Sequence, residues 1–229
     1  MFYVVDQKSQ TLLGMPAIKA LGLIPAIETV SMGDHVVASE SDRVLAEFKE
    51  VFDGLGKYCT PVKLQLKQGA VPKTAPARHV PEKVRDKLRV ELDRLVAEGI
   101  IARDMEPSEW LSPPVIVNRP SRAIRLCLDL QYLNTQLVRT QCTLDTPAEI
   151  FSRIQGFRFY SCLDAKQGFH QLGLDYESSR LTCFVTSFGK FRYCRLPMGV
   201  TNAPELFNQL MRDILSCIDG VECYIDDIC

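Results

Sequence analysis

Three aspartates stand at the ends of apolar segments and have the chemistry of a divalent-metal site. Asp164 follows Cys162-Leu163, and Asp226 and Asp227 follow Tyr224-Ile225. Carboxylates held together at strand ends repel one another unless a hard cation such as Mg²⁺ neutralises them. Two such ions would activate an attacking hydroxyl and stabilise a leaving pyrophosphate. Taken alone, an Asp-Asp pair is more often ordinary turn chemistry, so its surroundings decide the interpretation.

The surrounding sequence predicts the elements that hold these aspartates. In the clearest helix, an apolar stripe from Val84 to Val96 precedes Gly99, which suits a left-handed cap. Because helices alternate with antiparallel hairpins and no β-α-β run occurs, the pattern indicates an α+β fold. After residue 56, the predicted helices are 81–98, 147–154 and 202–215, and the predicted strands are 115–117, 124–128, 157–163, 170–174, 181–188, 191–196 and 221–225.

Composition bounds the class of protein. With 229 residues, 46% of them hydrophobic, and 13 Gly and 13 Pro, the chain is neither disordered nor collagen-like. The formal net charge of -1 argues against a uniformly basic nucleic-acid binder, yet residues 57–103 hold eleven basic and five acidic side chains. This segment is either a footprint for phosphate or a solvated helix face. Nine cysteines without a C-x-x-C pair indicate reduced thiols rather than zinc ligands.

Four segments closely resemble the reverse transcriptases of gypsy-type long-terminal-repeat retrotransposons. They occur in the order and at the spacing of that family, and the resemblance covers about residues 45–229. The segments are RLCLDLQYLN at 125–134, FYSCLDAKQGFHQ at 159–171, LPMGVTNAPELF at 196–207 and YIDD at 224–227.

The resemblance implies an RNA-directed DNA polymerase fragment, with the fingers and partial palm of a right-hand polymerase and an antiparallel palm sheet packed by helices. Asp164, Asp226 and Asp227 would be its metal-binding carboxylates. The implied reaction adds a dNTP to the 3′-hydroxyl of a DNA primer on an RNA template, with Mg²⁺, or alternatively Mn²⁺, as the metal.

The same resemblance implies five residues that contact the dNTP. Arg125, and less directly Arg119, would bind the triphosphate, a task suited to a guanidinium. Phe169 would lie against the sugar and exclude a 2′-hydroxyl, although a core role is about as frequent for such a residue. Ala165 and Met198 complete the set, and Gly199 after Met198 would permit close backbone approach.

The expected organisation has three parts. Residues 1–25 resemble the closing strand and helix of a retropepsin but lack its Asp-Thr-Gly triplet, residues 26–56 form a linker and helix, and residues 57–229 form the reverse transcriptase part. Because the chain ends at the catalytic hairpin, the thumb and ribonuclease H of a Pol polyprotein are expected to be missing. The isolated chain is then expected to lack processive synthesis; the alternative is an inactive relic that binds nucleic acid non-specifically.

The expected location is intracellular. The sequence shows neither a signal peptide nor a spanning helix, so no membrane association is expected. For an active element, the resemblance implies the cytoplasm, inside a virus-like particle, or the nucleus.

Overall fold

The computed structural model describes residues 43–44, 46–76, 78–117, 124–140, 145–154, 163–225 and 227–228. The chain divides after Gly54 into two compact units. The first contains the short helix α3 (Lys49–Phe52), and the second contains all other elements named below. The predicted retropepsin remnant at 1–25 lies outside the described residues. No helix in the described part is long and apolar enough to cross a membrane.

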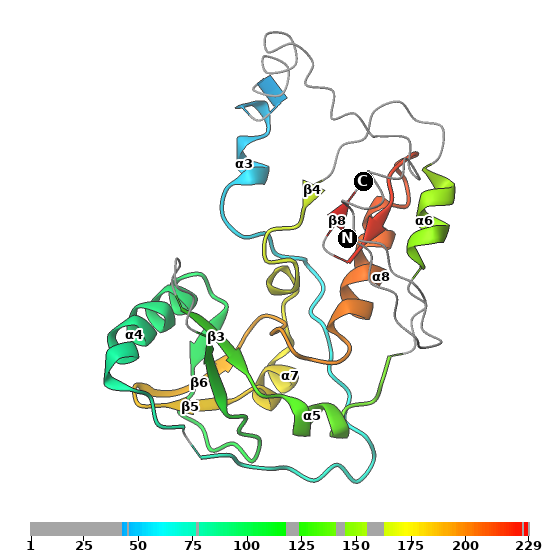
Figure 1. Cartoon of the computed structure of the whole chain (residues 1–229). Coiled ribbons are helices and arrows are strands. Elements are labelled where there is room, and N and C mark those ends of the chain that lie inside the picture. Colours follow the sequence, from blue (N-terminus) through cyan, green and yellow to red (C-terminus); the bar gives the residue numbers. More distant parts are fainter. Residues whose placement is uncertain are drawn as a thin grey trace, which may run out of the picture. The chain divides into compact units, whose positions relative to one another are not determined.

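Helix α4 (Glu82–Ala97) confirms the clearest prediction from the sequence (Figure 1). It begins after Pro81 and ends before Gly99, whose φ of +65° is the left-handed conformation that glycine adopts without strain. Its apolar stripe faces the core through Leu88, Leu92 and Leu95. Val96, predicted to belong to that stripe, is instead 39% exposed.

Helix α4 packs on a three-stranded antiparallel sheet and on a neighbouring hairpin. The sheet has the order β1-β6-β5 and consists of β1 (Ile101–Arg103), β5 (Phe184–Thr186) and β6 (Gly189–Tyr193). The hairpin pairs β2 (Pro114–Val117) with β3 (Arg125–Leu128), as the alternation of the sequence predicts. The Phe184 ring stacks on Phe191 and lies tilted against Tyr193, and these three rings form the aromatic centre of the core.

Two short helices follow the hairpin along the chain. Helix α5 (Gln131–Gln136) was not predicted, because its six residues are too few to show a helical period. Helix α6 (Pro147–Arg153) was predicted, and a capping box between Thr146 and Glu149 fixes its start. Arg153 of α6 forms ion pairs with Asp145 and Glu222, which tie this helix to the C-terminal part of the unit.

Two of the predicted strands are wrong in part. One strand was predicted at 170–174. Its first two residues belong instead to the 3₁₀ helix η1 (Gly168–Gln171), and of the others only Gly173 and Leu174 make isolated β-bridges. The strand predicted from 181 begins at 184 instead, because Leu181 ends helix α7 (Tyr176–Leu181). The side chain of Asp175 accepts a hydrogen bond from the backbone N–H of Ser178, which caps that short helix.

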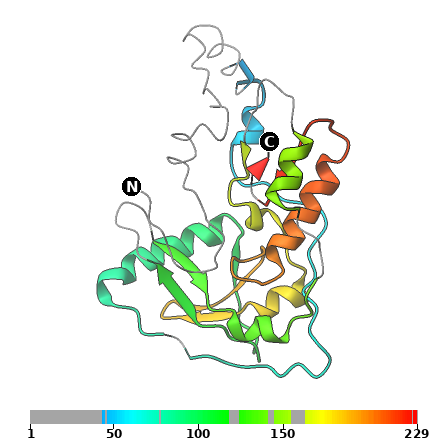
Figure 2. The same cartoon turned by 45° about the vertical axis from the view of Figure 1, so that its right-hand side comes forward.

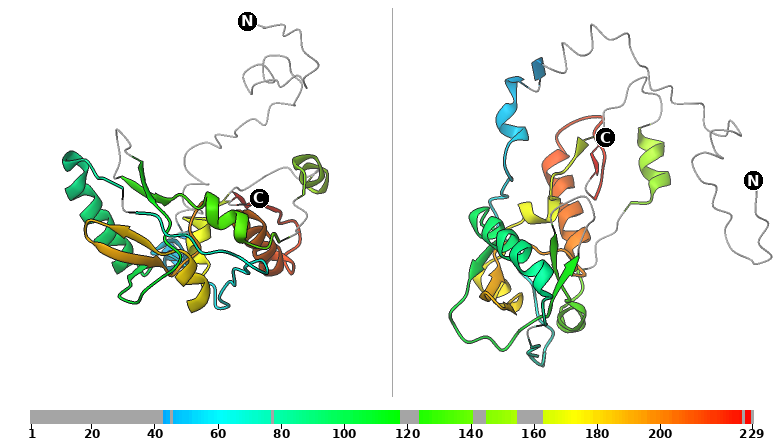
Figure 3. Two further views of the ribbon diagram at one scale, coloured as in Figure 1. Left: turned by 90° about the horizontal axis from the view of Figure 1, so that it is seen from below. Right: turned by 60° about the vertical axis from the view of Figure 1, so that its left-hand side comes forward.

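The C-terminal part places a small sheet beside helix α8 (Ala203–Leu215), which contacts η1 and β7 (Figures 2 and 3). This antiparallel sheet has the order β4-β8-β7 and consists of β4 (Leu163–Asp164), β7 (Cys223–Tyr224) and β8 (Asp227–Ile228). The strand predicted at 221–225 is therefore shorter than expected. The second strand of the hairpin is β8, which pairs with β7.

The segment before α4 is extended, as its prolines predict, and it is attached to residues far along the chain. The backbone N–H of Tyr58 donates to Gln171, and that of Val62 donates to Gly173. The N–H of Leu64 donates to the hydroxyl of Ser178, 114 positions later. These bonds hold the second unit together from its first residues.

Candidate metal centre and its surroundings

Two of the three predicted metal ligands lie opposite each other on neighbouring strands. Asp164 of β4 and Asp227 of β8 are register partners in an antiparallel pair. Side chains at such positions share one face of the sheet, with Cβ atoms about 4.5–5.5 Å apart. Both side chains are exposed, and neither forms a hydrogen bond or ion pair with another described residue.

This donor set fits a hard divalent cation. Two unpaired carboxylates on one face of a sheet repel each other, and an oxygen-seeking cation such as Mg²⁺ relieves that repulsion. The third predicted ligand, Asp226, lies outside the described residues. Among those that are described, no group of three His, Cys, Asp or Glu side chains is gathered for a metal, so the fit rests on the Asp164–Asp227 pair.

The backbone is strained on both sides of this carboxylate pair. Among described residues, the only non-glycine residues with positive φ are Gln167 at 50° and Ile225 at 56°. A β-branched residue such as Ile225 rarely adopts this conformation, and such strain persists only where surrounding contacts enforce it. The side chain of Asn208, 2% exposed in α8, accepts a hydrogen bond of 3.5 Å from the N–H of Ile225. Helix α8 therefore helps to hold the turn between β7 and β8.

Phe169 and Ala165 lie on the core side of the candidate site. Both are half-buried and pack against the hydrophobic core. The Phe169 ring meets Phe207 of α8 edge-on, with centroids 5.8 Å apart and an interplanar angle of 78°. The packing role that was weighed for Phe169 is thus present, and its role at a sugar stays a prediction.

The Met198–Gly199 turn is held by the side chain of Asn134, which was not among the predicted site residues. Gly199 has a φ of +97°, and a Cβ added there would lie 3.7 Å from the carbonyl oxygen of Leu128 in β3. Asn134 of α5 donates to the carbonyl oxygen of Gly199 at 2.8 Å and accepts from the N–H of Thr201 at 2.9 Å. Asn134 is the last residue of the segment RLCLDLQYLN at 125–134, and its place in that segment was the only indication in the sequence that it has a functional role.

Replacing Asn134 by Leu should destabilise the second unit by about 1–3 kcal/mol, because two backbone groups of the turn lose their partner. Urea unfolding, followed by circular dichroism, measures this difference. Gln131→Leu is the matched control, since no hydrogen bond from its side chain amide is present among the described residues. Equal stability of Asn134→Leu and the control would contradict the role of Asn134.

Only one of the two predicted triphosphate contacts is described. Arg125 begins β3 opposite Val117 and is half-buried, whereas Arg119 lies outside the described residues. The charge of Arg125 also acts on His170 in η1. Burial, with Arg125 and Arg94 adding to it, lowers the pKa of His170 to about 4. The imidazole is therefore neutral in the folded protein at pH 7.

This shift predicts a pH dependence of stability. The unfolded chain protonates His170 near the ordinary value of 6.5, and the folded protein does so only near 4. The free energy of unfolding should therefore fall as the pH falls from about 6.5 to about 4, by up to about 3 kcal/mol. Urea unfolding over this range should show a weaker slope for His170→Gln, and the wild-type slope for the exposed control His79→Gln. Identical slopes for all three proteins would refute the assignment.

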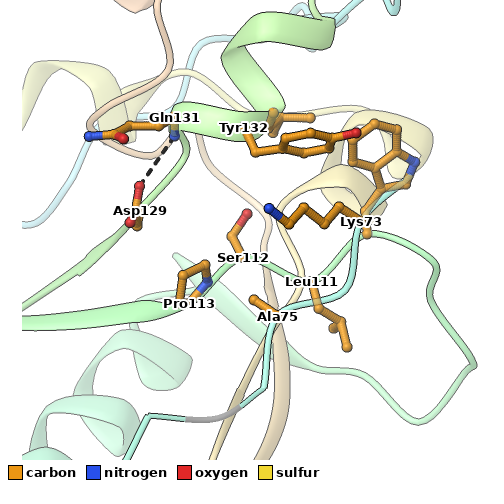
Figure 4. Close-up of a pocket in the computed structure, with 10 residues that line it drawn as sticks. Lys73, Ala75, Leu111, Ser112, Pro113, Asp129, Gln131 and Tyr132 are labelled. Carbon is orange, nitrogen blue, oxygen red and sulfur yellow. Dashed lines mark hydrogen bonds between the residues drawn. The ribbon is translucent and has the colours of Figure 1, made fainter. Parts of the chain in front are cut away.

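A cavity of about 190 Å³ lies beside α5 and is lined by aromatic, cationic and polar side chains (Figure 4). The Nζ atom of Lys73 lies 4.8 Å from the ring centroid of Tyr132, and the Trp110 ring is 6.4 Å from the same centroid. Asp129 lies at the other side, where it pairs with Arg78 at 3.2 Å and accepts from the N–H of Gln131. Aromatic rings beside a cation suit the stacking of a flat, anionic ligand.

Comparisons with known proteins agree with this geometry. The family model described as "Reverse transcriptase (RNA-dependent DNA polymerase)" matches residues 85–229. An uncharacterized protein of Caenorhabditis elegans is 36% identical over 80% of the chain, and the Drosophila melanogaster "Retrovirus-related Pol polyprotein from transposon opus" is 27% identical over 98%. The chain spans only 15% and 24% of these two relatives.

Solved structures show the same fold. The foamy viral protease-reverse transcriptase in complex with RNA/DNA hybrid has a TM-score of 0.75 at 19% identity. The match covers 97% of the chain and 30% of that structure. The fingers-and-palm architecture expected from the sequence is therefore confirmed.

Proposed function

Because the chain belongs to the reverse transcriptase (RNA-dependent DNA polymerase) family, we propose that it supplies the fingers and part of the palm of an enzyme that copies RNA into DNA. The observation that carries this proposal is the pairing of Asp164 with Asp227 on one face of the β4-β8-β7 sheet, with no ion-pair partner among the described residues. We further propose that the chain acts within a longer retrotransposon Pol polyprotein, which the relation to transposon opus supports.

In this proposal, Asp164 and Asp227, together with Asp226, hold Mg²⁺ or Mn²⁺. When bound, such ions neutralise phosphate charge and activate the primer 3′-hydroxyl. Arg125 binds the triphosphate through its planar guanidinium. The turn at Gly199 presents backbone to the nucleotide, because no side chain obstructs the approach there. Asn208 and Asn134 fix the two turns that carry these groups.

The proposed partners are an RNA template, a DNA primer and dNTP. The foamy viral protein is described in complex with RNA/DNA hybrid and, in another structure, with dsDNA. The cavity beside α5 adds support, because Trp110, Tyr132 and Lys73 offer the aromatic and cationic surfaces on which unpaired template bases stack. Exposed cations along 57–103 suit the template phosphates.

Primer extension by the polyprotein that contains this chain tests the proposal. With Mg²⁺ or Mn²⁺ and a primed RNA template, we expect DNA synthesis that stops when the metal is chelated. Synthesis that continues in chelator, or that is unchanged by Asp227→Asn, would overturn the proposed role of the carboxylates. Running the isolated 229-residue chain in parallel tests whether this part alone synthesises DNA processively, which we do not expect.

A non-catalytic nucleic-acid-binding function is the second candidate, and the exposed cations of residues 57–103 favour it. Lys83, Lys87 and Arg89 lie exposed along α4. Binding through such charges weakens steeply with salt and does not require a divalent metal. If the polyprotein shows salt-dependent, metal-independent binding to nucleic acid and no primer extension, this second function stands and the first fails.

Two expectations from the sequence remain part of the proposal. The retropepsin remnant at 1–25 is supported by solved relatives that are protease-reverse transcriptases and align with 97% of the chain. An intracellular location, in a cytoplasmic particle or the nucleus, follows from the proposed reaction rather than from the fold.

A further inference from the structure

A second cavity, of about 400 Å³, opens on a different part of the second unit. Its lining includes three cationic side chains, Lys57, Arg192 and Arg195, together with Tyr58 and Tyr176. No Asp or Glu is among the described residues that line it. The charged side chains that line this cavity are thus all positive, whereas the cavity beside α5 has the carboxylate of Asp129 in its lining.

The walls of this cavity are backbone segments joined by hydrogen bonds. Gly173 forms a β-bridge with Arg195, and Leu174 forms one with Val62. The N–H of Leu174 also donates to the carbonyl oxygen of Cys194. Three segments distant in sequence are therefore joined by hydrogen bonds in one wall, and Arg195 belongs to this wall.

Both arginines are held by neutral partners rather than by carboxylates. The Nη1 atom of Arg192 donates to the hydroxyl of Ser179 at 2.6 Å, and its guanidinium lies 5.0 Å from the Tyr176 ring centroid. The Nη1 atom of Arg195 donates to the carbonyl oxygens of Gly56 and Gln171 at 3.3 and 3.4 Å. Neither arginine forms an ion pair with a described carboxylate. Both are half-buried, so their positive charges are partly removed from water.

We propose that this cavity is a binding site for a phosphate group. Two guanidiniums oriented by neutral groups, with further N–H donors left over, match the several acceptor oxygens of a phosphate. Lys57 adds a third charge at the rim, where it is exposed and its Cε atom would lie 3.7 Å from a Cβ added to Gly173. The volume admits a phosphate with room for an attached group. The site shares no residue with the carboxylate pair and does not depend on the proposed function.

Isothermal titration calorimetry with inorganic phosphate, at constant ionic strength, tests the proposal directly. We expect binding to the wild-type chain and a dissociation constant raised about tenfold or more in Arg195→Gln and in Lys57→Gln. Lys57→Gln guards against misfolding, because Lys57 is exposed and makes no hydrogen bond to a described residue. Arg139→Gln, which removes an exposed charge outside residues 57–103, is the matched control and should bind as wild type.

Two further arms identify the source of the phosphate. A deoxynucleoside triphosphate without divalent metal and a single-stranded oligonucleotide are titrated into the same four proteins. Weakened binding of either probe by Arg195→Gln and Lys57→Gln, but not by Arg139→Gln, supports a phosphate site and names its ligand. If no probe discriminates these variants from the control, the proposal is wrong. Asp164→Asn should leave all these affinities unchanged, so a failed polymerase assay does not affect this test.

Discussion

Replacing Asp164 by Asn is expected to lower metal-dependent primer extension by about a thousandfold or more. The amide keeps the shape of the side chain but removes one of the two charges that face each other across β4 and β8. Metal-assisted charge stabilisation is worth several kcal/mol, and about 4 kcal/mol corresponds to a thousandfold change in rate. Primer extension by the polyprotein, with Mg²⁺ and a primed RNA template, measures the effect.

Stability measurements separate this loss from unfolding. Asp164→Asn removes a like-charge repulsion at an exposed position, so the free energy of unfolding should stay equal or rise slightly. Asp86→Asn, at an exposed position of α4, is the control and should leave extension unchanged. Full extension by Asp164→Asn would mean that this carboxylate does not hold the metal.

Replacing Asp104 by Asn is expected to destabilise the second unit by about 3–5 kcal/mol, the typical result of removing one partner from a buried ion pair. Asp104 is 5% exposed and accepts two hydrogen bonds from Arg180, at 2.9 and 2.8 Å. Lys190 of β6 adds a third contact at 3.0 Å, and the Cys183 thiol donates at 3.2 Å. Without the carboxylate, Lys190 stays partly buried with no ion-pair partner among the described residues, and Arg180 keeps only its longer ion pair with Glu106 at 3.5 Å.

The ionisation of Asp104 supports this expectation. Burial alone would raise the pKa of Asp104, but hydrogen bonds from Cys183 and Lys190 lower it below its ordinary value of 3.8. A lowered folded pKa means that the contribution is present above pH 3.8 and is lost as the pH falls further. Urea unfolding at pH 7 and at pH 3 should show a smaller difference between wild type and Asp104→Asn at pH 3. Asp93→Asn, exposed on α4, should match wild type at both values.

The sequence predicted those elements whose signals are local. Helix α4, with its long apolar period and glycine cap, was predicted, and so was α6. Helices α5 and α7 have six residues each, which is less than two turns and too short for a period to appear. Residues 170 and 171 were predicted to begin a strand, because the single 3₁₀ turn that they belong to has no periodicity of its own.

The candidate site was predictable as far as family motifs reach. The motifs identified Asp164 and Asp227, and the sheet then showed them in register. No local pattern indicated that Asn208 reaches the turn at Ile225, since the contact joins a helix to a hairpin. The cationic cavity could not be predicted from the sequence either. Lys57 and Arg192 are far apart along the chain, and long-range β-bridges bring the segments around the cavity together.

That long-range pairing sets the order of events on the ribosome. Leu64 cannot satisfy its N–H with the hydroxyl of Ser178 until 114 further residues have been made. At roughly 5–20 residues per second, the wait is roughly 6–23 s. During this time the extended segment from Tyr58 to Leu64 has apolar side chains and unpaired backbone groups with no native partner. A nascent chain of this kind is a natural client for a ribosome-associated chaperone.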